Sequence, residues 1–277
     1  MARLNDIFSR YGFMPLVAAV LFLAVTSCST TSRLGKDDVL YTGVKKVTVT
    51  PAAGEKVPEG VDDKINTAVK VDPNGLKVMG MTFQWIPIGL WTYNHMSNPE
   101  KGLKHWLYEK LVQEPVLISD VRPQLRTKMI ENELSNSGYF RNKASYELVY
   151  SKKNPKKAKI AYTIETGPAY LLDSIEYLPD TCHLYHKIDS IARFNNYLRK
   201  GERYSTDSLS AARTRIANSL RNLGYYFFLP EYIEYLADST LTRERIALRL
   251  AIARNVPKFA IQRYRTGDIK GAALPTL

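Results

Sequence analysis

The amino-acid sequence repeats itself after 86 residues, and this repeat limits the possible folds more than any other feature of the chain. A gap-free shift places residues 134–139 on residues 220–225, so that both copies contain an Asn-x-Gly-Tyr sequence. The same shift aligns Ser119 with Ser205, Ile130 with Ile216, Tyr146 with Tyr232, and residues 160–161 with residues 246–247. Because these matches share one offset, we interpret the two segments as copies of one duplicated unit.

Each copy has the pattern of an amphipathic helix that ends at a glycine. Apolar residues recur every three or four positions in both segments, which indicates one buried helix face. Ser119 and Ser205 are expected to cap the helix starts, with Pro123 near the first turn of the first helix. Gly138 and Gly224 are expected to end the helices in the left-handed conformation, and the aromatic residues after each glycine are expected to fold back under the helix.

Runs of alternating apolar and polar residues predict strands before and after these helices. The expected strands are residues 44–50, 145–150 and 158–165 in the first copy, and residues 170–178, 230–236 and 245–253 in the second. A shorter helix is expected at residues 61–69 and 186–198, and residues 259–265 have the pattern of a further strand. Each unit therefore reads β-α-α-β-β, and the predicted fold class is α+β. The expected domains are residues 44–169 and 170–255, followed by the start of a truncated third unit at residues 256–277.

The amino terminus has the pattern of a bacterial secretory signal. Two arginines precede an apolar run at residues 14–25, which is too short to cross the ~30 Å hydrocarbon layer as a helix. The run is followed by Thr-Ser-Cys ending at Cys28, which resembles the lipobox of bacterial lipoproteins. The resemblance implies that residues 1–27 are a lipoprotein signal peptide, that Cys28 is the lipid attachment site, and that residues 28–43 are a linker. Ordinary cleavage that leaves Cys28 as a free thiol is the alternative.

Composition and motifs argue against an enzyme. The formal net charge is +12 and 45% of the residues are hydrophobic, which excludes a disordered acidic tail and a polytopic membrane protein. The sequence has no G-x-S-x-G, P-loop or G-x-G-x-x-G motif, so we expect no catalytic residues and no cofactor. Cys182, His183 and His186 could offer zinc ligands, but we interpret them as a polar loop and expect no metal. An enzyme whose site is assembled from scattered residues stays open as an alternative.

Two further segments could contact a partner. Residues 72–116 are an insertion relative to the second unit and hold all three tryptophans, Trp85, Trp91 and Trp106. They could form an aromatic surface for a partner or for the lipid interface, but a local minicore is favoured because aromatic residues usually pack. The lysine-rich turn at residues 152–159 is interpreted as a solvated hairpin tip. Contact with anionic lipid headgroups or an acidic protein is the alternative, and export argues against nucleic acid.

The order of elements and the helix endings resemble a known family. Tandem β-α-α-β-β units that end in Asn-x-Gly-Tyr-Phe at residues 136–140 and Asn-x-Gly-Tyr-Tyr at residues 222–226 resemble the POTRA domains of the BamA/TamA outer-membrane assembly family. The lipobox, LYTGVKKVTV at residues 40–49 and GLWTYN at residues 89–94 are similar to its lipid-anchored TamA-like branch, called TamL. The resemblance implies tandem POTRA-like domains, each a three-stranded mixed sheet with two helices on one face.

The resembled family continues into a membrane β-barrel, in which each strand needs ~9 to 11 residues to cross the bilayer. Only 22 residues follow Asn255, so we expect no β-barrel in this chain. A truncated gene, a fragment of a longer protein and a stand-alone periplasmic paralogue all stay open. The alternative function is a stand-alone lipoprotein adaptor or spacer without insertase activity.

The resemblance also implies a function in protein translocation and assembly. It places the second strand of each unit at the edge of its sheet, where an extended segment can add by β-augmentation. The residues expected to bind clients or a partner at these edges are Tyr146, Leu148, Tyr150, Tyr232, Ile233 and Tyr235. The implied partners are outer-membrane protein clients, a TamB-like periplasm-spanning protein and the membrane through the lipid anchor, with no nucleic acid. The implied location is the outer membrane, lipid-anchored, with the domains in the periplasm.

Overall fold

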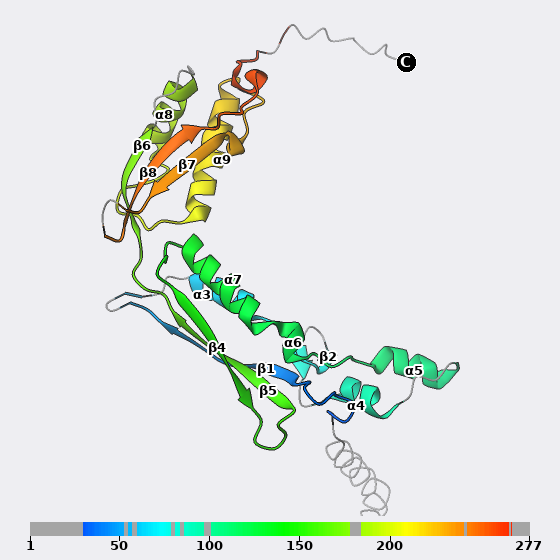
Figure 1. The fold of residues 1–277 in the computed structure, drawn as a ribbon. Helices are drawn as coiled ribbons and strands as arrows, with labels where there is room; N and C mark the ends of the chain where they lie inside the picture. The colour runs from blue at the N-terminus through cyan, green and yellow to red at the C-terminus, as the bar shows by residue number, and fades with distance from the viewer. Residues whose placement is uncertain are drawn as a thin grey trace, which may run out of the picture. The chain divides into compact units, whose positions relative to one another are not determined.

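In the computed structural model, two three-stranded sheets and their helices follow each other along the chain (Figure 1). The structure describes residues 30–52, 55–56, 60–78, 81–83, 86–96, 101–177, 184–240, 243–265 and 267. The predicted signal peptide, Cys28, Trp85, Cys182 and His183 lie outside these residues. No helix in the described part is long and apolar enough to cross a membrane.

The first copy contains a sheet in the order β1-β5-β4. Its elements are β1 (Leu40–Thr50), α3 (Val61–Val69), α6 (Ile118–Val121), α7 (Pro123–Asn136), β4 (Lys143–Tyr150) and β5 (Lys157–Glu165). Strand β5 lies in the centre, and its alternate residues Ala158, Ile160, Tyr162 and Ile164 are buried. The predicted strand with one buried face is therefore confirmed.

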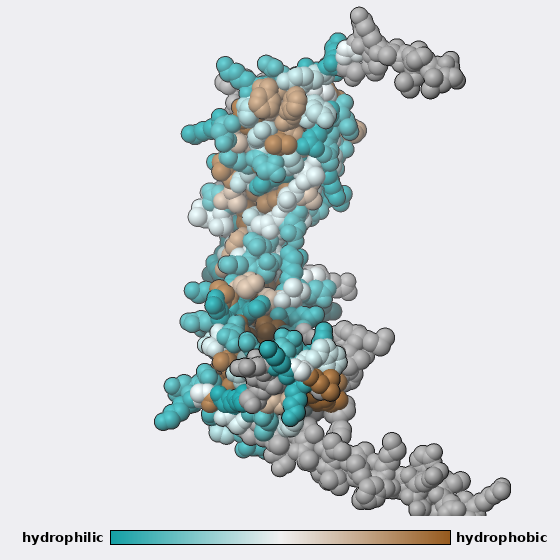
Figure 2. Space-filling view, turned by 90° about the vertical axis from the view of Figure 1, so that its right-hand side faces the viewer, coloured by the Kyte–Doolittle hydropathy of each residue, from teal (hydrophilic) through white to brown (hydrophobic). Residues whose placement is uncertain are grey.

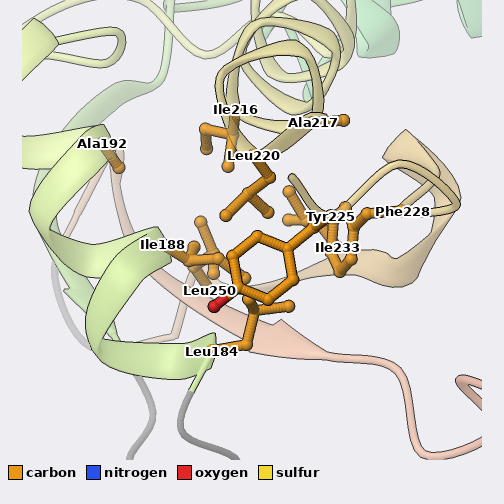
Figure 3. Close-up of a cluster of buried hydrophobic side chains, with 10 residues drawn as sticks. All are labelled: Leu184, Ile188, Ala192, Ile216, Ala217, Leu220, Tyr225, Phe228, Ile233 and Leu250. Carbon is orange, nitrogen blue, oxygen red and sulfur yellow. The ribbon is translucent and has the colours of Figure 1, made fainter. Parts of the chain in front are cut away.

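The second copy contains a mixed sheet in the order β6-β8-β7, in which β8 pairs parallel with β6 and antiparallel with β7. Its elements are β6 (Leu171–Tyr177), α8 (Leu184–Asn195), α9 (Thr206–Asn222), β7 (Ile233–Asp238) and β8 (Arg245–Ile252). Leu184 and Ile188 of α8 pack with Ile216 and Leu220 of α9 in one cluster that includes Leu250 of β8 (Figure 3). Each such burial contributes about 1.5–3 kcal/mol. Both helices thus cover one face of the sheet, as predicted for an α+β unit.

The ends of the long helices follow the prediction. Gly138 and Gly224 have φ angles of 89° and 98°, a conformation that favours glycine. The amides of Tyr139 and Tyr225 then donate to the carbonyls five residues earlier, and both rings are buried. Of the two aromatic residues after each glycine, only the first therefore folds under the helix. Ser205 caps α9, since its hydroxyl accepts an amide of the first turn at 3.4 Å.

The long helix of the first copy starts later than predicted. Arg122 has a φ of 50° and separates the short α6 from α7. The cause is Pro123, because the residue before a proline avoids the helical conformation while proline itself fits the first turn of a helix. Ser119 therefore lies inside α6, and Asp120 accepts the amide of Leu117 at 3.0 Å instead.

Two predicted strands also differ from the structure. The run expected from Pro230 begins with the 3₁₀ turn η1 (Pro230–Tyr232), and β7 starts only at Ile233. The strand predicted from Phe259 is wrong, because Lys258–Ile261 form the 3₁₀ turn η2. No described strand pairs with this segment, and an isolated strand would leave its backbone groups unpaired.

The insertion at residues 72–116 has its own elements. They are β2 (Leu76–Val78), β3 (Met81–Phe83), α4 (Ile88–His95) and α5 (Leu103–Leu111). Leu90 of α4 packs with Leu34 and Leu40, which lie outside the insertion, and this cluster contains no aromatic residue. Trp106 of α5 is 55% exposed, and the minicore interpretation does not explain it.

The contacts divide the chain into two compact units that do not follow the repeat. The first unit holds residues up to 48, residues 66–129 and residues 144–163, and the second holds residues 49–65, residues 130–143 and the residues from 164 onward. The end of α7 and the turn at Gly138 therefore belong to the same unit as the second copy. The domain boundaries drawn from the sequence stay a prediction.

Candidate functional site

Each sheet has an outer strand that follows the long helix in sequence. Strand β4 lies at one end of the order β1-β5-β4, and β7 at one end of the order β6-β8-β7. Within the described part of the chain, neither strand has a second neighbour. An outer strand presents a row of backbone N–H and C=O groups along its open side. The sheet orders thus place both strands where the resemblance to POTRA domains implied.

On β4, the predicted contact residues form one face of the strand. Tyr146 and Tyr150 are exposed, and Leu148 between them is partly buried. The Ser145 hydroxyl donates to the carbonyl of Thr163 on β5 at 3.3 Å, which links β4 to its one described neighbour. Because alternate residues point to the same side of a strand, the two tyrosines lie on one face next to the open edge.

On β7, the predicted contact residues have different surroundings. Ile233 is fully buried in the core, so its side chain cannot contact a client. Tyr232 precedes the strand, and its ring packs edge-on against Phe228 with a centroid distance of 5.5 Å. Tyr235 is partly buried, and the guanidinium carbon of Arg213 lies 5.1 Å from its ring centroid. Of these three residues, Tyr235 is the one that borders the groove between α9 and β7.

The backbone of β7 has a definite open side. The amide of Ala253 donates to the carbonyl of Tyr232 at 2.9 Å, and the register continues by pairing Tyr235 with Leu250. Hydrogen-bonded and non-hydrogen-bonded pairs alternate along an antiparallel ladder. Tyr235 and Ala237 therefore direct their N–H and C=O groups away from β8, toward the open edge.

An open groove of about 410 Å³ lies between α9 and β7. Helix α9 contributes Leu209, Ser210 and Arg213, and β7 contributes Tyr235 and Ala237. The Nε atom of Arg213 is buried and has no hydrogen-bond acceptor among the described residues. A groove beside an open strand can receive the alternate side chains of a strand that adds to it.

The groove has a defined electrostatic character. Burial raises the pKa of the Tyr204 phenol, which also lines the groove, and the charge of Arg213 opposes this shift. The guanidinium of Arg213 brings a positive charge to the groove, and the carboxylate of Asp207, which also lines it, forms an ion pair with Lys64 at 2.6 Å. The groove therefore combines charges of both signs with phenol groups. Sequence reasoning missed Arg213 and Tyr204, because no local pattern shows that α9 lies beside β7.

The lysine-rich turn between β4 and β5 is partly structural. The Nζ atom of Lys156 donates to the carbonyl of Leu34 at 2.8 Å. Burial lowers the pKa of Lys157. Lys152 and Lys153 are exposed, so the predicted solvated tip describes these two lysines and not Lys156.

Only one of the three residues that could offer zinc ligands is described by the structure. Cys182 and His183 lie outside the described residues, and His186 lies in α8. Among the residues that the structure describes, no group of three or more His, Cys, Asp or Glu side chains is placed to hold a metal ion. The absence of a metal and of a cofactor stays a prediction.

No protein-family model and no curated protein sequence matches the chain. Among solved structures, the chain is similar to POTRA domains 3–5 of BamA from Haemophilus influenzae, with a TM-score of 0.37 and 13% identity over 80% of this chain and 69% of that one. It is also similar to POTRA domains 1–2 of Omp85 from Anabaena, with a TM-score of 0.35 and 12% identity over 79% and 98%. CdiB from Escherichia coli is more distant, with a TM-score of 0.26 and 10% identity over 83% and 30%. At such values the similarity by itself establishes no function, and the α+β class follows from the chain's own sheet orders.

Proposed function

We propose that this chain is a periplasmic, lipid-anchored, POTRA-like module of a machine that translocates or assembles outer-membrane proteins. Its units bind extended client strands or a periplasm-spanning, TamB-like partner by β-augmentation. The observation that supports this proposal is the shared sheet order, which leaves β4 and β7 open in two copies of one unit. Pairing through backbone groups tolerates many sequences, as a module with many clients requires.

The β7 edge offers the more complete binding site. Tyr235 and Ala237 supply outward backbone groups, and the groove beside them can hold side chains of an added strand. Arg213 gives that groove a positive charge, which favours clients with a carboxylate at the facing position. The exposed tyrosines on β4 supply a second, more aromatic edge.

The anchor in this proposal is Cys28, on the strength of its lipobox-like sequence. Two or three acyl chains, at ~0.8 kcal/mol per buried CH₂ group, hold a protein stably on a membrane. Metabolic labelling with palmitate is expected to mark the chain, and Cys28→Ser is expected to abolish the label. A label that persists in the Cys28→Ser variant would contradict this assignment.

Ala237→Pro tests the β7 edge directly. Proline removes an outward N–H group without removing a bond to β8, so the sheet is expected to stay intact while strand addition is blocked. A photo-crosslinker at the exposed Glu234 is expected to capture extended clients in cell envelopes, and Ala237→Pro is expected to abolish this capture.

Ala237→Val is the matched control, since it changes the side chain but keeps the N–H group, and capture should persist. Circular dichroism checks that each variant is folded. Unchanged capture in a folded Ala237→Pro variant would refute addition at β7 and leave β4 as the remaining edge.

A further inference from the structure

The segment that follows the predicted lipid attachment site is held on α4. Asn94 donates from Nδ2 to the carbonyl of Thr30 at 3.0 Å, and its Oδ1 accepts from the Ser32 hydroxyl at 3.0 Å and the Arg33 amide at 2.9 Å. Asn94 and Thr30 are both buried. The predicted linker at residues 28–43 is therefore fixed to the protein from Thr30 onward.

A second set of contacts fixes the same segment from the other side. Asn154 donates from Nδ2 to the hydroxyl of Thr31 at 3.0 Å, and Lys156 donates to the carbonyl of Leu34. Two residues span at most ~7 Å, so an anchor at Cys28 stays close to Thr30. Acyl chains on Cys28 would consequently bring α4 to the bilayer surface.

Helix α5 is joined to α4 within the same compact unit. The amide of Gln113, just after α5, donates to the carbonyl of Gly89 in α4 at 3.2 Å. A Cβ atom at Gly89 would collide with the Gln113 side chain, so glycine permits this close approach. The anchored segment, α4 and α5 therefore form one connected structure.

Helix α5 carries large apolar side chains that the described residues leave uncovered. Leu103 is 74% exposed and Trp106 is 55% exposed. Trp106 follows Leu103 by three residues, and Lys110 follows Trp106 by four. This spacing places the three side chains along one side of the helix. Lys104 is exposed as well. Figure 2 views the molecule from the side on which α5 lies in Figure 1, and shows hydrophobic side chains among the polar ones.

We infer that α5 lies in the bilayer interface, with Leu103 and Trp106 at the boundary between headgroups and acyl chains. Tryptophan is enriched at this depth, and lysines such as Lys104 and Lys110 can reach anionic headgroups while their stems stay among apolar groups. A lipid surface is favoured over a protein groove because an anchor at Cys28 holds α4, and with it α5, next to the membrane. The inference thus rests on the anchor in the proposed function.

Quenching of tryptophan fluorescence by brominated lipids tests this placement. The full chain is reconstituted in vesicles of phosphatidylcholine and phosphatidylglycerol with brominated acyl chains. Trp106→Phe is expected to remove most of the quenching. Trp91→Phe is the matched control on α4, where Trp91 is partly buried and stacks on His95, and it should reduce the quenching clearly less than Trp106→Phe. Lys104→Glu with Lys110→Glu is expected to reduce quenching in anionic vesicles more than in vesicles of phosphatidylcholine alone.

Each outcome of this experiment decides one claim. Equal quenching in the wild-type chain and Trp106→Phe would overturn the interface placement. A photo-crosslinker at position 106 that captures a protein in cell envelopes, without lipid quenching, would also overturn it and make α5 a protein-binding helix. Palmitate labelling decides the anchor separately. A labelled chain without Trp106 quenching refutes the placement of α5 alone, and quenching without a label refutes the anchor alone.

Discussion

The two copies end their long helices in the same turn, but different parts of the chain cover it. The carbonyl of Gly138 accepts the amide of Tyr170, just before β6, at 2.9 Å. The carbonyl of Gly224 accepts the amide of Tyr264, after β8, at 2.7 Å. The glycine turn is thus common to both copies, but the amides that bind it do not come from matching positions of the repeat.

The second contact at each turn comes from an Arg-Tyr pair in both copies. A Cβ atom at Gly138 would lie 2.5 Å from the carbonyl oxygen of Tyr204, and one at Gly224 would lie 2.7 Å from that of Tyr264. In the first copy, two tyrosines from different parts of the second copy share the contacts. In the second copy, Tyr264 supplies both the amide and the carbonyl, and Arg263 lies against Gly224 as Arg203 lies against Gly138. At both glycine turns, backbone groups from a later part of the chain lie close to the glycine. We therefore expect an added Cβ atom to lower the free energy of unfolding by a similar amount at Gly138 and at Gly224.

The largest effects are expected in the helix cores just before the turns. Leu134 and Leu220 align in the repeat, and both side chains are fully buried. Leu134→Ala and Leu220→Ala should each lower the free energy of unfolding by about 2–5 kcal/mol, because each leaves a cavity. Urea unfolding of the full chain measures both values. If one substitution lowers the free energy of unfolding by less than half as much as the other, the two cores are not equivalent.

The glycine turns come next in size. Gly138→Ala and Gly224→Ala should each cost about 2–4 kcal/mol, since a left-handed non-glycine residue is strained and the added Cβ meets a backbone carbonyl. Gly201→Ala is the control, because Gly201 has a φ of 86° but no atom within 4 Å of its added Cβ. It should cost only about 1–2 kcal/mol. If Gly138→Ala and Gly201→Ala lower the free energy of unfolding equally, the backbone near Gly138 adds no steric cost to the first turn.

We expect the aligned serines Ser119 and Ser205 to contribute differently to the free energy of unfolding. Ser205→Ala removes a hydroxyl that accepts an amide of α9, and it should cost about 1 kcal/mol. Ser119→Ala changes a residue inside α6 that has no capping role, so the free energy of unfolding should stay within about 0.5 kcal/mol. Thermal melts of the two variants compare the aligned serines. A larger loss for Ser119→Ala would contradict the helix start at Pro123.

Alkaline pH should affect one copy through a residue that the other lacks. Burial raises the pKa of Tyr162 on β5 to about 12, whereas the aligned residue on β8 is Leu248. Because the folded pKa lies above the ordinary value of about 10, the neutral phenol stabilises the fold below pH 10, and this contribution is lost as the pH rises toward 12. Tyr162→Phe should reduce the loss of stability between pH 9 and 12 and change little at pH 7. Parallel pH profiles of the wild-type chain and the Tyr162→Phe variant would refute the assignment.

Most of the secondary structure could be predicted because it follows from the local spacing of apolar residues. The range predicted for α3 is the one observed, and β5 and β8 differ from the prediction by one residue at an end. The errors arose where local pattern and tertiary context disagree. Residues 259–265 alternate like a strand, but no neighbouring strand is there to pair with them, and Pro123 divides a helix whose apolar pattern runs on past the break.

The candidate site was only partly predictable for the same reason. The outer position of β7 was implied by resemblance, and Tyr235 does border the open edge. Ile233 was predicted to lie at the binding edge, and this stays a prediction, but its side chain is buried in the core, because alternation tells that a residue lies on one face and not which face the core covers. Arg213 and the exposed face of α5 could not be found without knowing which elements lie together.

The sequence by itself determined the duplication, the order β-α-α-β-β and the glycine that ends each long helix. These features depend on spacing of 2 or 3.6 residues and on the conformational freedom of one residue, which act within a few positions of the chain. Only the tertiary structure decided that Tyr264 takes the place of two tyrosines at the second turn, that Arg213 meets Tyr235, and that Asn94 holds the segment after Thr30. Each of these contacts joins residues far apart in sequence. Such pairs depend on how helices and sheets pack together, and no local pattern in the sequence indicates them.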